Sequence, residues 1–195
     1  DGIQTAAAFV PLFSSQIVAK LYLRQANSGP AFWLRRAADL WLGISLLLVC
    51  MLAAMELPVA LGWISASTAG YTLVSIAAAI TAYSVLNAYS PSVVEIEITS
   101  AKVNSTLRFA QITDVHIGSR TSAFLARVMD KVNSLDIEFL CITGDFIDAP
   151  GVSEHALSAL RSCRVPIYFS IGNHERYEDL DDILARLERL GVNVL

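Results

Sequence analysis

Residues 137–148 read IEFLCITGDFID, an apolar run of strand length that ends in a glycine and two acidic residues. Two further stretches share this design, LRFAQITDVH at 107–116 and PIYFSIGNHE at 166–175. Short apolar runs bounded by turn residues are typical of buried strands. Helical patterns alternate with them at 121–135, 154–162 and 180–190. Alternating strands and helices predict βαβ units and a largely parallel sheet, which places this region in the α/β class.

Two more strands are expected at the borders of this region. Residues 192–195, VNVL, follow a glycine and look like a final strand with nothing after it, so we expect the chain to be an internal fragment of a longer protein. SVVEIEIT at 92–99 alternates apolar and polar residues, which suits a half-buried antiparallel or edge strand.

Each of the three apolar runs ends in side chains that can bind a metal. These are Asp114 and His116, then Asp145 and Asp148, then Asn173, His174 and Glu175. Because ligands of parallel α/β sheets bind at the carboxyl ends of the strands, we expect one shared site. Strand alternation would place Asp114 and His116 on the same side. Carboxylate, amide and imidazole ligands suit Mn, Fe or Zn, and a shared carboxylate can bridge two such ions.

Each of these residues also has a purely structural interpretation. A single Asp at a strand end usually caps a helix or forms a turn, and a single His is more often structural than catalytic. Three such coincidences at the same end of three consecutive strands favour a functional site.

DVH at 114–116, GDFID at 144–148 and GNHE at 172–175 resemble, in order and spacing, the first three signature blocks of the calcineurin-like metallophosphoesterases. The resemblance covers about residues 107–195. It implies the first half of an α/β/β/α sandwich with two divalent metal ions, which hydrolyses phosphomonoesters or phosphodiesters. By position it implies that Asp114 and His116 hold the first metal, that Asp145 bridges, and that Asn173 holds the second.

The resemblance also implies roles in the reaction itself. His174 would protonate the leaving oxygen or stabilise the transition state, with Asp148 as its carboxylate partner. Glu175 would support the ligands from behind, with a plain surface charge as the alternative. The family's later blocks, a separate His and a G-H-x-H, do not occur here, and the remaining histidine, His155, is expected at the surface. We therefore expect these 195 residues alone to bind metal weakly and to turn over poorly.

The N-terminal half has the composition of a membrane protein. Hydrophobic residues make up 54% of the chain and charged residues 16%, against about 25% charged in soluble domains. Only seven charged residues lie in 1–94. Leu40–Met55 and Gly70–Ala88 carry no charge and approach the length of a membrane span, and Gly2–Ala19 is a weaker third candidate. A signal peptide or a buried apolar helix is the alternative. We predict a membrane region over 1–90 and the N-terminal part of a catalytic domain over 91–195, as in bacterial membrane-anchored members of the family.

Charge asymmetry indicates an orientation. Lys20, Arg24, Arg35 and Arg36 precede the first strong span, whereas only Glu56 follows it. The positive-inside rule places residues 20–37 in the cytoplasm, so a multi-pass inner-membrane protein with a cytoplasmic catalytic domain is expected.

The remaining features limit the choice of partners. Basic residues do not cluster, so nucleic acid is not expected as a partner. Cys50, Cys141 and Cys163 are expected to be buried free thiols. The favoured function is a membrane-bound phosphoesterase, with lipid-linked esters as favoured substrates; the alternative is a catalytically incomplete membrane sensor or binding module. A transporter is disfavoured, since the spans contain no charge to mark a substrate path.

Overall fold

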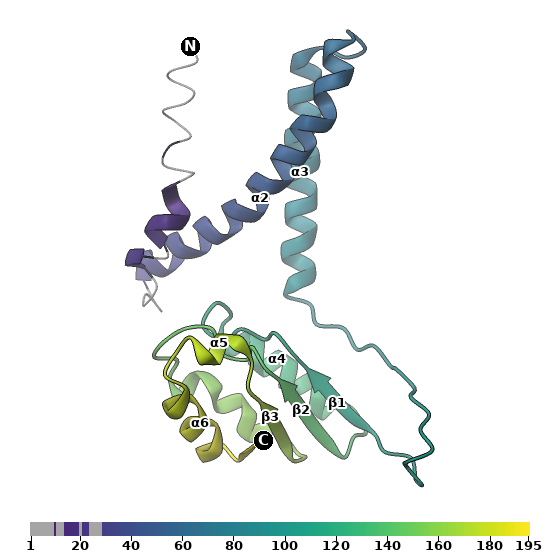
Figure 1. Cartoon of the computed structure of the whole chain (residues 1–195), viewed down its shortest axis with the longest axis vertical. Coiled ribbons are helices and arrows are strands. Elements are labelled where there is room, and N and C mark those ends of the chain that lie inside the picture. Colours follow the sequence, from purple (N-terminus) through teal and green to yellow (C-terminus); the bar gives the residue numbers. More distant parts are fainter. Residues whose placement is uncertain (1–9, 11–13, 20, 24–28) are drawn as a thin grey trace. The chain divides into compact units, whose positions relative to one another are not determined.

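The computed structural model describes residues 10, 14–19, 21–23 and 29–195 (Figure 1). The chain divides into two compact units, Asp1–Ser92 and Val93–Leu195. Each unit is described by itself below.

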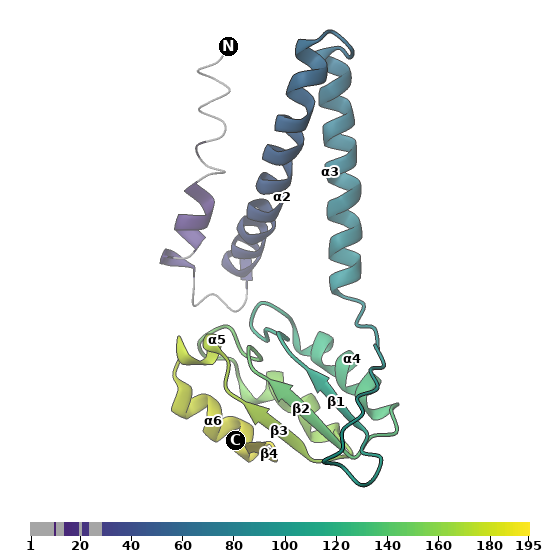
Figure 2. The same ribbon diagram turned by 45° about the vertical axis from the view of Figure 1, so that its right-hand side comes forward.

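The second unit is built on a four-stranded parallel sheet (Figure 2). Its strands, in spatial as well as chain order, are β1 (Phe109–Ile112), β2 (Phe139–Thr143), β3 (Ile167–Ser170) and β4 (Val192–Val194). The connecting helices are α4 (Ser122–Asn133), the 3-10 helix η1 (Glu154–Ser162), α5 (Asn173–Arg176) and α6 (Leu180–Arg189). The predicted α/β class with a parallel sheet is confirmed.

The helices cover one face of the sheet, and the core lies between. Right-handed crossovers between neighbouring parallel strands bring all connecting helices to the same side. Along β2, Leu140 and Ile142 are fully buried, whereas Phe139 and Cys141 on the opposite face are half-buried. The apolar stripe of α4 is buried at helical spacing, at Phe124, Leu125, Val128, Met129 and Val132.

Polar side chains cap the N-terminal ends of α4 and α6. Thr121 caps α4 by accepting a hydrogen bond from the Phe124 N–H, and Asp179 caps α6 by accepting one from the Asp182 N–H. Gly191 follows α6 at a φ of 85°, a conformation that costs glycine least.

The predicted strand over 92–99 is wrong. These residues form no strand, and Ile96 and Ile98 are 78% and 79% exposed. The alternation would give a strand one apolar and one polar face. A strand also needs a neighbouring strand that pairs with its backbone N–H and C=O groups, and alternation does not supply one.

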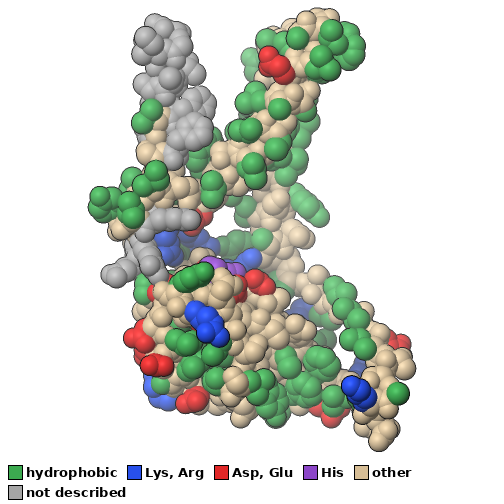
Figure 3. Space-filling view, viewed as in Figure 1, with side chains coloured by type: hydrophobic (Ala, Val, Ile, Leu, Met, Phe, Trp, Pro, Cys, Tyr) green, Lys and Arg blue, Asp and Glu red, His purple; other side chains and the backbone are tan. Residues whose placement is uncertain are grey.

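The first unit contains two long apolar helices, α2 (Gly29–Ala60) and α3 (Ala66–Ala88). Both are long and apolar enough to cross a membrane. Hydrophobic side chains are exposed along both helices (Figure 3). Gly62, in the left-handed region, lies in the turn between them, and Ser65 caps α3 by accepting from the Thr68 N–H.

Pro58 lies inside the last turn of α2. The expectation that all three cysteines are buried is wrong: Cys50 is a free thiol but lies exposed on α2, whose apolar side chains are largely exposed, and Cys141 and Cys163 of the second unit are free and half-buried. Most of the candidate span Gly2–Ala19 lies outside the described residues.

Candidate metal centre

Three loops meet at the carboxyl edge of the sheet, one after each of β1, β2 and β3. Backbone hydrogen bonds join the first loop to the second: the His116 N–H donates to the Asp145 carbonyl at 3.0 Å, and the Ile117 N–H donates to the Phe146 carbonyl at 2.7 Å. The two loops therefore run side by side and bring their polar side chains together, as expected from the parallel sheet.

Three residues of these loops have an unusual backbone. Asp114, His116 and Asp145 lie at φ values of 55°, 54° and 50°, in the left-handed region that side chains other than glycine rarely adopt. Asp114 and His116 do lie close together, but the alternation of side chains along a strand, which we expected to be the reason, is not the reason. Both lie beyond the end of β1, yet His116 Nε2 is 3.7 Å from Asp114 Oδ1, so the left-handed turns bring them together. Strain of this kind often marks functional sites.

Two of the predicted ligands, His116 and Asp145, cluster with His174, the predicted acid. Ligand atoms of His116, Asp145 and His174, all half-buried, lie within 4.8 Å of one another. The Asn173 amide lies beside the same carboxylate, with its nitrogen able to donate to both Asp145 oxygens at 3.3 and 3.2 Å. The His174 N–H also donates to Asp145 Oδ1 at 3.0 Å. Asp145 is thus the central carboxylate of the cluster.

Asp148 lies beside a different histidine from the one expected. Its Oδ2 is 3.4 Å from His116 Nδ1, and its Oδ1 accepts from the Ser119 N–H at 2.9 Å. The rings of His116 and His174 meet edge to face with centroids 4.7 Å apart. A carboxylate beside one ring nitrogen fixes which nitrogen faces a metal, so Asp148 orients His116. Its pairing with His174 stays a prediction.

Glu175 is fully buried below the cluster. Its Oε1 accepts from the Phe146 and Ile147 N–H groups at 2.7 and 2.9 Å. Its Oε2 accepts from the Asp145 and Gly172 N–H groups at 3.1 and 2.9 Å. One carboxylate from the third loop thus fixes the backbone of the second, including that of Asp145. The role of a plain surface charge does not fit a side chain with no exposed surface.

Gly144 and Gly172 allow the second and third loops to touch. A Cβ on Gly144, whose φ is 82°, would lie 2.7 Å from the Gly172 Cα. A Cβ on Gly172 would lie 2.3 Å from the Asp145 backbone nitrogen. Neither position has room for a side chain, because the opposing atoms are backbone.

Two residues near the cluster escaped the sequence analysis. The Thr113 hydroxyl donates to Asp114 Oδ2 at 2.6 Å, and the Tyr177 ring, 69% exposed, meets the His174 ring at a centroid distance of 6.3 Å. Thr113 directly precedes DVH, and Tyr177 lies two residues beyond GNHE. Their closeness to these motifs in the sequence was the one feature that could have indicated a place near the site.

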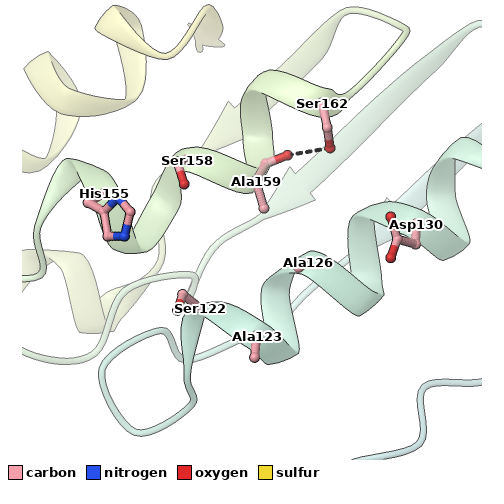
Figure 4. A pocket seen from close by; sticks show the side chains of 8 residues that line it. All are labelled: Ser122, Ala123, Ala126, Asp130, His155, Ser158, Ala159 and Ser162. Atoms are coloured by element: carbon pink, nitrogen blue, oxygen red, sulfur yellow. Dashed lines mark hydrogen bonds between the residues drawn. The ribbon is translucent and has the colours of Figure 1, made fainter.

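His155 is exposed, as expected, and lies away from these loops. It lines an open groove of about 470 Å³ between α4 and η1, with Asp130 toward the other end of the groove (Figure 4). The small side chains of Ala123, Ala126 and Ala159 form this groove, which contains none of the predicted ligands.

The donor set fits a divalent metal. Two imidazoles, a central carboxylate and an amide converge on one volume, and no thiol is among them. Mn, Fe and Zn all accept such mixed nitrogen and oxygen ligands.

Comparison with known proteins agrees with this chemistry. Residues 107–194 match the family described as Calcineurin-like phosphoesterase. An uncharacterized metallophosphoesterase of Helicobacter pylori is 25% identical over 115 residues, which are 54% of this chain and 30% of that protein. UDP-2,3-diacylglucosamine pyrophosphatase LpxG of Chlamydia trachomatis is 35% identical over 75 residues, 35% of this chain and 22% of that protein.

The chain therefore spans less than a third of the length of these curated relatives. No solved structure matches it. The family match begins just before β1 and includes β4, so it covers the three loops that carry the candidate ligands. Over residues 107–194, the chain is thus similar to the calcineurin-like phosphoesterases.

Proposed function

We propose that this chain carries the metal-binding half of a phosphoesterase that hydrolyses phosphate esters with divalent metal ions. The observation that carries the proposal is the cluster of His116, Asp145 and His174, whose ligand atoms lie within 4.8 Å of one another. The buried Glu175 carboxylate fixes the loop behind this cluster by accepting hydrogen bonds from the backbone N–H groups of Asp145 and Phe146. Hydrogen bonds that hold a ligand-bearing loop in place support the geometry of a site.

Each ligand has a distinct proposed place. Asp114 and His116 would hold a first ion, Asp145 would contribute to both sites, and Asn173 would hold a second ion. Bound divalent ions would supply positive charge that polarises a phosphoryl group and acidifies water. Asp148 keeps the His116 ring oriented through the contact at its Nδ1.

His174 is proposed as the group that protonates the leaving oxygen. Its ring is half-buried at the side of the cluster, and its backbone N–H is fixed by Asp145. The same ring also lies close enough to the other ligands to bind an ion directly. The two roles differ in a measurable way: loss of an acid leaves metal content unchanged, whereas loss of a ligand lowers it.

The proposed substrates are phosphoesters attached to lipids. Two features support this: a chain with two helices able to cross a membrane, and a relative named for a diacylglucosamine pyrophosphatase activity. We further propose that residues 1–90 form the membrane region of a multi-pass inner-membrane protein, and that residues 91–195 form part of a cytoplasmic catalytic domain. The excess of basic residues before Leu40 supports this orientation.

The test uses the detergent-solubilised protein at its natural length and the 195-residue chain in parallel. Hydrolysis of a chromogenic phosphomonoester and phosphodiester is measured with added Mn, Fe or Zn, and bound metal is measured by elemental analysis. We expect Asp145→Asn to lower both metal content and turnover, and His174→Ala to abolish turnover with metal retained. Glu188→Gln, an exposed change on α6, is the matched control. The 195-residue chain is expected to turn over poorly, whereas a folded natural-length protein without turnover under any metal would refute the proposal and favour a binding module.

A further inference from the structure

The start of α2 and the end of α3 share a cluster of arginine and aromatic side chains. We call Phe32, Trp33, Arg35, Arg36 and Tyr89 the arginine–aromatic cluster. The Arg36 guanidinium donates to the Tyr89 hydroxyl across the helix pair. Its Cζ lies 5.0 Å from the Phe32 ring centroid and 5.8 Å from that of Trp33, while the Arg35 Cζ lies 5.9 Å from Phe32. The cluster is built from residues 53 positions apart in sequence.

Helix length places this cluster at a membrane surface. With a rise of 1.5 Å per residue, the 23 residues of α3 span about 35 Å, slightly more than a bilayer core of about 30 Å. Tyr89 is the cap at the end of α3, and Arg36 lies beside it. When the two helices cross a membrane, Arg36 and Tyr89 therefore lie at the depth of the lipid headgroups.

The two ends of the helix pair differ in charge. Arg35 and Arg36 lie at the cluster end, and the sequence from 37 to 90 contains no Lys or Arg. The opposite end contains Glu56 and Trp63. Asp39, the one acidic side chain near the cluster among the described residues of the two helices, accepts a hydrogen bond from Gln16 at 3.3 Å. Among the residues of α2 and α3, the basic side chains therefore all lie at the cluster end.

We propose that the arginine–aromatic cluster binds the phosphate of an anionic phospholipid. A guanidinium has five N–H donors in one plane, and the contacts of Arg36 with the Tyr89 hydroxyl and with the Phe32 and Trp33 rings hold that plane in place. The remaining donors can engage a phosphate with two parallel hydrogen bonds. An anionic headgroup fits better than a zwitterionic one, because Arg35 and Arg36 repel a headgroup cation. This site goes beyond the proposed hydrolysis and depends only on membrane insertion of the helices.

Tryptophan fluorescence can test the site directly. The chain has three tryptophans, Trp33, Trp41 and Trp63. A variant with Trp41→Phe and Trp63→Phe leaves Trp33 as the reporter at the cluster, and one with Trp33→Phe and Trp41→Phe leaves Trp63 at the opposite end. Each is reconstituted in phosphatidylcholine vesicles that contain a minor fraction of acyl-brominated phosphatidylglycerol or the same fraction of acyl-brominated phosphatidylcholine. Bromine quenches an indole only at short range.

We expect brominated phosphatidylglycerol to quench Trp33 more strongly than brominated phosphatidylcholine, and both lipids to quench Trp63 equally. Arg36→Gln should lower the relative affinity for phosphatidylglycerol about fivefold. Arg36→Lys should not restore it, since an ammonium cannot lie flat against two rings while it binds a phosphate.

Three outcomes would overturn the proposal. Equal quenching of Trp33 by the two lipids would mean that no anionic lipid is preferred at the cluster. If Arg36→Lys kept the full preference for phosphatidylglycerol over phosphatidylcholine, positive charge alone would attract the lipid. Absence of quenching of Trp63 by either lipid would mean that the helices do not insert.

Discussion

The carboxylate of Glu175 offers the sharpest test of how the metal centre is held together. Each of its two oxygens accepts two backbone N–H groups, and all four donors lie in the second or third loop. Glu175→Gln replaces one oxygen by an NH₂ group, which cannot accept. Two buried N–H groups then lose their acceptor, whichever way the amide turns.

The size of the effect follows from these contacts. Hydrogen bonds to a charged group contribute about 1.5–3 kcal/mol each, so two lost bonds cost about 3–6 kcal/mol. At about 1.4 kcal/mol per power of ten, the population of an open second loop should rise about 100- to 10,000-fold. Hydrogen exchange measured by mass spectrometry reports this opening as faster exchange of the amides at 145–147.

A matched variant separates this effect from a general loss of charge. Glu188→Gln makes the same chemical change at an exposed position of α6 and should leave exchange at 145–147 unchanged. Glu175→Asp retains the charge but shortens the side chain, so it should give an intermediate rate. If Glu175→Gln exchanged at the parental rate in these amides, the idea that this carboxylate holds the second loop would be wrong.

Three further predictions concern other parts of the second unit. Gly172→Ala should sharply lower the bound metal measured by elemental analysis, because its Cβ would lie 2.3 Å from the Asp145 nitrogen, whereas Gly70→Ala in α3 meets no atom within 4 Å and should leave metal content unchanged. Hydrogen bonds from Arg189 and Arg161 hold the pKa of the exposed Glu154 below its ordinary 4.5, so their stabilising effect is present above that value and lost as the pH falls through the lowered pKa. Between about pH 5 and pH 3, the unfolding temperature should therefore fall more in the parent than in Glu154→Gln, and equal falls would contradict the role of this ion pair. Tyr177→Ala should raise KM for a bulky ester with kcat retained, because this exposed ring lies beside His174, while Tyr177→Phe should behave as the parent; an unchanged KM would show that the ring does not contact substrate.

The sequence was sufficient to predict the parallel sheet and that the loops after β1, β2 and β3 meet at its carboxyl edge. An apolar run such as 137–143 predicts a buried strand. In a parallel sheet with helical connections, the carboxyl ends of the strands all lie at the same edge. The capping residues Thr121 and Asp179 likewise act over only three residues, so the local sequence is enough to identify them.

Other features depend on contacts that no local pattern reveals. The left-handed conformations of Asp114, His116 and Asp145 could not be predicted, because these residue types usually adopt other conformations and the surrounding loops impose this one. The rings of His116 and His174 are in contact with one another, and the sequence does not show that Asp148 lies beside His116. Segment 92–99 has the alternation of a strand, but alternation does not specify a partner strand.

The contact between Gly144 and Gly172 limits which substitutions these two positions can accept during evolution. Each glycine occupies the space that a side chain on the other loop would need, so the effect of a substitution at one position depends on the residue at the other. We expect epistasis between the two positions, because a side chain at Gly144 would meet the Gly172 backbone and one at Gly172 would meet the Asp145 backbone nitrogen. The two loops, 28 residues apart in the chain, are thus constrained to vary as one unit.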